Sequence, residues 1–189
     1  MTKSKCLICG MTINNKNYQL NASTFTDENT DQLILRCPFC GAMETHLGSQ
    51  DEHVYAAEGH SYKVQKILDM AMKLEVFNSE FYEEASKQAK SKDLHVLFQE
   101  LSKIEWMHAS VHKILGGFDA LPSLRLPDYS RHHTDALLLA EAHKREIHAI
   151  AFYKRYYDQV PEVIQKIFRG LMEVETEHVK ITEIQAKGD

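Results

Sequence analysis

The chain has 189 residues, of which 22 are Lys or Arg and 27 are Asp or Glu, so its formal net charge is −5. That charge argues against a nucleic-acid partner, because nucleic-acid-binding surfaces are basic. The length is enough for one good core, or for one domain with a small satellite. No apolar run is long enough to cross a bilayer, and the first residues lack an apolar signal region. We therefore expect a cytoplasmic protein with no membrane partner.

Two Cys-x-x-Cys pairs lie near the N-terminus, and each is followed at once by a glycine: Cys6 and Cys9 before Gly10, and Cys37 and Cys40 before Gly41. Two such pairs, about 30 residues apart, can place four thiolates around one metal ion. The glycines allow a tight turn and leave backbone N–H groups free to point at sulfur. A disulfide framework and free buried thiols are the alternatives, but a reducing compartment and the doubled motif favour a four-cysteine metal site.

The residues between the two pairs are polar and Asn-rich, with strand-like pieces at 18–20 and 33–35. They contain too little apolar material for an independent core, so the metal ion would have to hold residues 1–45 together as a small ribbon module. Residues 46–60 form a polar connector. Its histidines recur every seven residues and are interpreted as solvated surface side chains: His46, His53 and His60.

Four segments from residue 61 onward have the apolar periodicity of long helices, over 62–90, 94–115, 134–157 and 161–186. Pro161 suits the first turn of the fourth. The long connection at 116–133 contains Pro122 and Pro127, whereas the other two connections are short. We therefore predict a mainly α protein in which residues 61–189 form a ferritin-like four-helix bundle with one long crossover.

An internal repeat carries the candidate chemistry. Glu105 and His108 lie in the second predicted helix, and Glu175 and His178 lie in the fourth. In each pair the two residues are three apart, so they share one helical face. A single pair of this kind is weak evidence for a metal site, because glutamate is common in this chain.

Each preceding helix supplies a matching glutamate. Glu75 lies 30 residues before Glu105, and Glu146 lies 29 residues before Glu175. All four carboxylates would meet at mid-height on apolar faces, where they would be costly without charged partners. Four carboxylates neutralise two divalent cations, and two imidazoles complete the coordination. We therefore predict a dinuclear iron or manganese site in the bundle.

The bundle resembles that of the rubrerythrins, a family of the ferritin-like superfamily. With the rubredoxin-like cysteine module, the resemblance covers nearly everything except the connector. It implies a non-haem diiron centre in which Glu105 and Glu175 bridge, Glu75 and Glu146 are terminal ligands, and His108 and His178 each bind one iron. The cysteine module would hold one iron, as in rubredoxin, or one zinc, as in a structural ribbon.

The resemblance also implies an enzyme of oxidative-stress defence. It would reduce hydrogen peroxide to water, with electrons from a reductase or a rubredoxin entering through the thiolate-bound iron, and it would form a homodimer. Three alternatives remain: an iron-binding or storage protein with a structural zinc ribbon, a diiron oxidase, and a dimanganese catalase.

Three further residues have open roles. Tyr82 and Tyr153 each lie seven residues after a predicted glutamate ligand. They are candidate catalytic residues, whose hydroxyls would hydrogen-bond ligands or bound peroxide, or they are large core aromatics. His143 stands where rubrerythrins have an additional carboxylate, and it could be a substitute ligand, a supporting group or a surface histidine.

Overall fold

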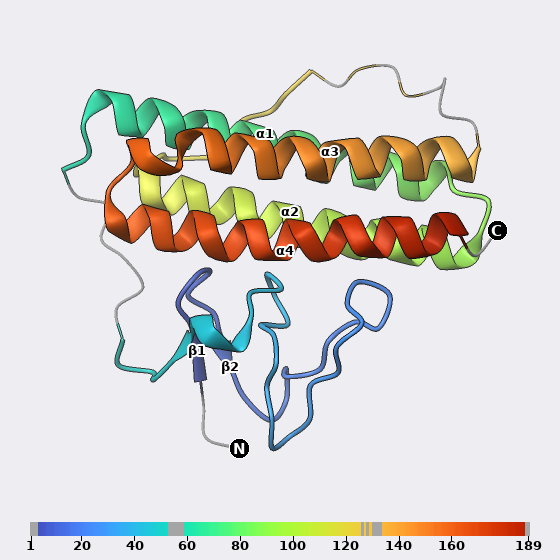
Figure 1. Ribbon diagram of the computed structural model, residues 1–189, viewed down its shortest axis with the longest axis horizontal. Coiled ribbons are helices and arrows are strands. Elements are labelled where there is room, and N and C mark those ends of the chain that lie inside the picture. The colour runs from blue at the N-terminus through green and yellow to red at the C-terminus, as the bar shows by residue number, and fades with distance from the viewer. Residues whose placement is uncertain (1–3, 53–58, 126, 128, 130–133, 188–189) are drawn as a thin grey trace.

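The computed structural model describes residues 4–52, 59–125, 127, 129 and 134–187. Its main feature is a set of four long helices lying side by side in two layers (Figure 1): α1 (Tyr62–Gln88), α2 (Lys92–Gly116), α3 (Asp135–Tyr156) and α4 (Glu162–Lys187). Each helix end lies within two residues of the end that the sequence pattern predicts. The prediction of a mainly α protein is therefore confirmed.

Local sequence explains where the helices begin. Ser61 and Thr134 are the N-cap residues of α1 and α3, and their side chains accept hydrogen bonds from Val64 N and Leu137 N. Ser91 stands at the N-cap of α2 but its side chain makes no capping bond. The turn before α2 is held from elsewhere, because the Asp135 carboxylate accepts hydrogen bonds from Lys90 N and Ser91 N, both at 2.8 Å.

The chain returns between α2 and α3 from one end of the helices to the other (Figure 1). Tyr129 in this crossover is buried and accepts a hydrogen bond from Arg145 Nη2 at 3.2 Å. The Arg145 guanidinium also lies over the rings of Phe77 and Phe81. These contacts hold Tyr129 of the crossover against α1 and α3.

The N-terminal module lies against the layer formed by α2 and α4 (Figure 1). It has a small antiparallel sheet in the order β2-β1-β3, made of β1 (Ser4–Cys6), β2 (Thr12–Ile13) and β3 (Leu47–Gly48), with a 3-10 turn at Glu44–His46. Strand pairing thus extends beyond residue 45, into the stretch predicted as connector.

The strands predicted at 18–20 and 33–35 are wrong, because neither segment is in a strand. The side chain of Asn29 replaces a strand ladder there. Its Nδ2 donates to Tyr18 O and Arg36 O, and its Oδ1 accepts from Leu35 N and Arg36 N. One buried amide therefore satisfies backbone groups that a sheet would otherwise pair.

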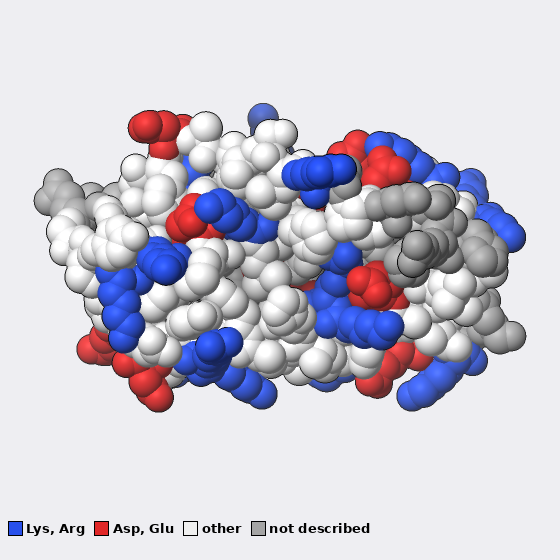
Figure 2. All heavy atoms as spheres, turned by 90° about the horizontal axis from the view of Figure 1, so that it is seen from above, with Lys and Arg blue, Asp and Glu red and all other residues white. Residues whose placement is uncertain are grey.

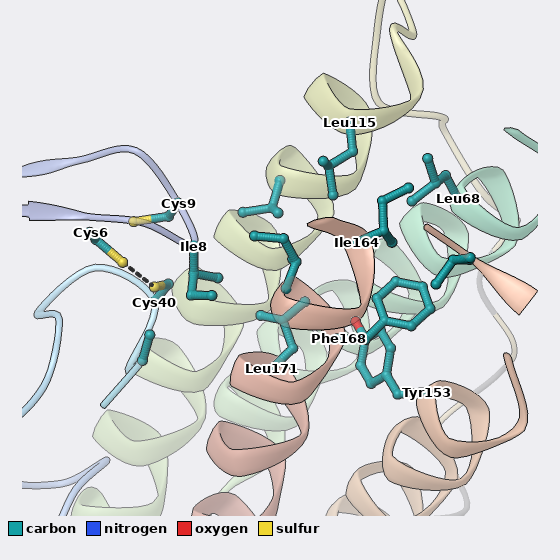
Figure 3. Packing of buried hydrophobic residues seen from close by; sticks show 14 of the residues in the cluster. Cys6, Ile8, Cys9, Cys40, Leu68, Leu115, Tyr153, Ile164, Phe168 and Leu171 are labelled. Atoms are coloured by element: carbon teal, nitrogen blue, oxygen red, sulfur yellow. Dashed lines mark hydrogen bonds between the residues drawn. The ribbon is translucent and has the colours of Figure 1, made fainter. Parts of the chain in front are cut away.

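Two glycines allow the module to approach α4 closely. A Cβ on Gly170 would lie 2.7 Å from Ile8 Cδ1, and one on Gly41 would lie 2.9 Å from Val174 Cγ1. Gly41 also has a φ of 75°, which other residues rarely adopt. Figure 3 shows Ile8 extending from beside the cysteines toward the helices, and Ile8 and Ile13 belong to the same apolar cluster as Phe168 and Leu171.

Two polar contacts join the module to α4. Arg36 Nη2 lies 3.4 Å from Glu177 Oε2, and His46 Nε2 lies 2.8 Å from Glu173 Oε2. The interpretation of His46 as a solvated side chain is therefore wrong, since it is largely buried by its contact with α4. His53 lies outside the described residues, and His60 is half-buried.

Acidic and basic side chains are interspersed over the face seen from above in Figure 2, so this face offers no extended basic surface among its described residues. None of the described helices combines the length and the apolar character that a membrane span requires.

Candidate metal centres

The four cysteines form a buried cluster between the sheet and the helices. Cys6 Sγ lies 3.6 Å from Cys40 Sγ, and Cys9 Sγ lies 3.7 Å from Cys37 Sγ. All four side chains can place one ligand atom within 4.8 Å of the others. A tetrahedral site with metal–sulfur bonds of about 2.3 Å would have sulfur–sulfur edges of about 3.8 Å. The spacing of the sulfurs therefore fits one tetrahedral metal ion.

The thiols do not share one electrostatic environment. Burial raises the pKa of Cys37 and Cys40, whereas hydrogen bonds from those two residues lower the pKa of Cys6. Thiols held in this way lose their protons together only when a cation takes the place of the protons. The four buried thiols form a donor set that could bind a metal ion.

The second cluster lies in the middle of the four helices and contains all six predicted ligands. One group consists of Glu75, Glu105, His108 and Glu175, and the other consists of Glu105, Glu146, Glu175 and His178. Within each group the ligand atoms lie within 4.8 Å of one another. Glu105 and Glu175 belong to both groups, which is the arrangement that two bridging carboxylates would have.

All six side chains of this carboxylate–histidine cluster are fully buried. His108 Nδ1 lies 3.0 Å from Glu175 Oε1, and His178 Nδ1 lies 3.3 Å from Glu105 Oε1. Yet among the described residues both Glu105 carboxylate oxygens and His108 Nδ1 have no hydrogen-bond partner. Buried polar atoms are rarely left in this state, so the residues fit a pair of bound cations.

The pKa values of the side chains in this cluster depend on one another. Burial and the charges of Glu105 and Glu175 raise the pKa of Glu75 and of Glu146. Burial alone would disfavour charged imidazoles, but the neighbouring carboxylates raise the pKa of His108 and His178. Burial likewise opposes ionisation of Glu175, but the two imidazoles lower its pKa. The protons on the imidazoles of His108 and His178 thus carry positive charge that two divalent cations would supply if they were bound.

Both candidate tyrosines contact the cluster across the helix pairs. The hydroxyl of Tyr82 in α1 donates a hydrogen bond to Glu146 in α3, and the hydroxyl of Tyr153 in α3 donates one to Glu75 in α1. Both side chains are fully buried. Each tyrosine therefore orients a glutamate that belongs to only one ligand group: Tyr82 orients Glu146, and Tyr153 orients Glu75.

The two clusters are connected through His108. Its Nδ1 faces the carboxylates, while its Nε2 donates a hydrogen bond to the main-chain oxygen of Cys40 at 3.0 Å. Phe25 of the module also packs against His178, with ring centroids 5.9 Å apart. The sequence pattern predicts both clusters but not this contact, which depends on how the module docks.

The structure also places residues whose roles were open or missed. His143 lies in neither cluster, and its Nδ1 contacts Thr182 Oγ1 at 3.4 Å. Asn78, three residues after Glu75, has its Nδ2 3.4 Å from Glu75 Oε2. His112 hydrogen-bonds Tyr153 at 2.7 Å. Its position one turn after His108 is the only signal in the sequence that could have indicated it.

Comparison of the chain with protein-family models, with curated proteins and with solved structures found no match. The class of each site is therefore argued from its own donor atoms. One is a four-thiolate cluster, and the other is a buried carboxylate–histidine cluster able to bind metal.

Proposed function

We propose that the protein is a rubrerythrin-like oxidoreductase: a ferritin-like four-helix bundle with a non-haem diiron centre that reduces hydrogen peroxide to water. Electrons enter through iron bound by the four cysteines. The proposal combines the fold, the ten buried donor side chains and the resemblance described above. The ligands are Glu75, Glu105, His108, Glu146, Glu175 and His178 in the bundle, and Cys6, Cys9, Cys37 and Cys40 in the module.

The observation that carries this proposal is the double contact of His108. A storage protein with a structural ribbon would use this hydrogen bond only to orient a ligand imidazole, a task that any nearby main-chain carbonyl could perform. An electron carrier benefits, because the imidazole spans the distance between the two clusters. The contact therefore favours redox chemistry over storage.

When bound, two adjacent iron ions supply one electron each, which matches the two electrons needed to cleave an O–O bond. The protein's own residues supply the setting. Four carboxylates balance the charge of two divalent cations, and full burial keeps bulk water away. Tyr82 and Tyr153 hold hydroxyl hydrogens at the oxygens of Glu146 and Glu75, where they fix the carboxylates in position.

The biological setting that fits this activity is the cytoplasm, with a reductase or a separate rubredoxin as electron donor. We propose a homodimer on the basis of the resemblance. Manganese in the bundle and zinc in the module are the alternative metals.

A stopped-flow experiment tests the proposal. The fully reduced, iron-loaded protein is mixed with hydrogen peroxide or with oxygen, and reoxidation of the bundle iron is followed by absorbance. We expect peroxide to reoxidise it much faster than oxygen does. Equal rates, or a faster reaction with oxygen, would mean that the peroxidase assignment is wrong and would favour an oxidase or a storage protein.

A further inference from the structure

His112 is a fully buried histidine on α2, one helical turn beyond His108 and outside the predicted ligand set. Its Nε2 lies 2.7 Å from the hydroxyl oxygen of Tyr153. Its ring packs against Phe168 in an edge-on contact, with centroids 5.9 Å apart, and Phe168 also packs against Tyr153. The imidazole is therefore held in a fixed orientation beside the phenol.

The direction of the hydrogen bonds follows from counting hydrogens. A phenol has one hydrogen, and that of Tyr153 is donated to Glu75. His112 must then be the donor to the phenol oxygen, with its hydrogen on Nε2. In agreement, His112 Nδ1 is buried and has no hydrogen-bond partner in the described part of the chain, as a bare lone pair allows. Burial, together with the charge of His108, lowers the pKa of His112 to about 3, so the ring is neutral.

Among the residues that the structure describes, none plays the same part in the other half of the cluster. Tyr82 corresponds to Tyr153 in the repeat, but among the described residues its hydroxyl bonds only to Glu146. The residue four positions after His178 is Thr182, and it contacts His143 instead of a tyrosine. The two halves of the ligand set are nearly symmetric. Among the described residues, however, a histidine bonds the tyrosine of the Glu75 half and none bonds the tyrosine of the Glu146 half.

We propose that His112 is a positioning residue for the carboxylate–histidine cluster: by donating its Nε2 hydrogen to Tyr153, it directs the phenol hydrogen onto Glu75 and makes the Glu75 half of the cluster distinct from the Glu146 half. This inference deepens the proposed function and rests on its dinuclear site. It does not depend on which substrate reacts there.

Metal binding tests the inference without turnover. Co²⁺ is titrated into metal-free protein, and the visible absorption of cobalt in the bundle is followed. Cobalt bound to the cysteines is recognised by its sulfur charge-transfer band. The wild-type protein should bind the two bundle cobalt ions in distinct steps. In H112L, the Glu75 step should weaken by up to about 10-fold, because His112 acts on Glu75 only through Tyr153, whereas removing a ligand's own hydrogen-bond partner usually costs about 10- to 100-fold.

Two variants serve as controls. H112Q retains an amide hydrogen that can reach the phenol, so it should restore most of the affinity lost in H112L. T182V changes the matched position of the other half and should leave the Glu75 step unchanged. If H112Q binds cobalt as weakly as H112L, or if T182V causes the same loss, the effect is one of packing and the inference is wrong.

A double-mutant cycle with Y153F excludes a trivial folding defect. Because His112 is inferred to act through Tyr153, H112L should cost little further affinity in a Y153F background. Additive losses would overturn the inference. A ¹⁵N-histidine spectrum of the zinc-filled protein should also show His112 protonated at Nε2, and protonation at Nδ1 would contradict it.

These outcomes are separable from the proposed function. An unchanged cobalt titration in H112L, with peroxide still the better oxidant of the wild-type protein, would overturn only the role of His112. Distinct cobalt steps that depend on His112, in a protein that reacts no faster with peroxide than with oxygen, would overturn only the peroxidase assignment.

Discussion

The Nε2 atom of His108 lies 3.0 Å from the main-chain oxygen of Cys40, while the other ring nitrogen faces Glu175. One imidazole therefore contacts both candidate metal centres. The hydrogen bond to a main-chain oxygen also fixes the tautomer of the neutral ring, in which the Nδ1 lone pair would be available to a metal ion. The module is thus part of the environment of the second cluster and does not merely precede it in the chain.

Removing one cysteine should separate the two centres functionally. In C37S the thiolate-bound metal should be lost, while the metal ions of the bundle remain, because their ligands come only from the helices. Reduction of the bundle iron by an external donor should then slow. The measurement is stopped-flow reduction, with metal content determined in parallel.

The wild-type protein with zinc in its cysteine site is the matched control for this variant, because zinc is redox-inert. Its bundle iron should be reduced as slowly as that of C37S. Rapid reduction in the zinc-containing protein would show that electrons bypass the cysteines.

Glutamates that belong to one or to both ligand groups should differ in their effect on metal content. E105A removes a ligand from both groups, so both bundle ions should be lost or strongly weakened. E75A removes a ligand from one group and should leave one ion in place. Elemental analysis after dialysis distinguishes these outcomes, and E183A, which changes an exposed residue of α4, is the control. Loss of the thiolate-bound metal together with the bundle ions in E105A would contradict two independent sites.

Replacing a glycine in the contact between the module and α4 should lower the stability of the protein more than replacing a glycine in open space. In G41A the new methyl group would meet Val174 and Phe25 at a positive φ, so we expect a loss of about 2–4 kcal/mol in unfolding free energy. Gly59 has a similar φ of 81°, but a methyl group there would meet no atom of the described residues within 4 Å, so G59A should lose only about 1–2 kcal/mol. Urea unfolding measures both variants. Equal losses would mean that the module does not dock as described.

His112 should contribute a pH dependence to stability. Its pKa is about 3 in the folded protein, against about 6.5 when exposed. Below about pH 6.5 the unfolded chain therefore takes up a proton that the folded protein does not, so unfolding becomes easier as the pH falls. Between pH 7 and pH 5 this proton uptake lowers the unfolding free energy by about 2 kcal/mol.

H112Q lacks that titration, so its unfolding free energy should fall by about 2 kcal/mol less than that of the wild-type protein between pH 7 and pH 5. Urea unfolding of both proteins at the two pH values measures the difference. Parallel pH profiles would show that His112 is not held neutral by burial.

The helices and the ligand positions could be predicted because both follow local rules. Apolar periodicity marks a helix, and the spacing of Glu105 and His108 places both on one face whatever else the chain does. The repeat of the pattern at Glu175 and His178 then indicates where the helices must meet. The structure brings all six side chains together within that cluster.

The parts that could not be predicted depend on tertiary contacts. Asn29 replaces the expected strand pairing with side-chain hydrogen bonds, which no alternation of polar and apolar residues reveals. His46 looks like one of three evenly spaced connector histidines until α4 brings Glu173 beside it. The partnership of His112 with Tyr153 likewise depends on tertiary packing, which brings one side chain of α2 and one of α3 within 2.7 Å of each other.

The contact between Cys40 and His108 joins two candidate metal centres that are parts of one polypeptide. Since both residues belong to one polypeptide, the two centres are made in equal numbers and meet at an effective concentration that the fold fixes. Dilution or a change in expression level does not alter how often they meet. Under the proposed function, chance encounter would then matter only for the first electron transfer, from the outside partner to the cysteine module.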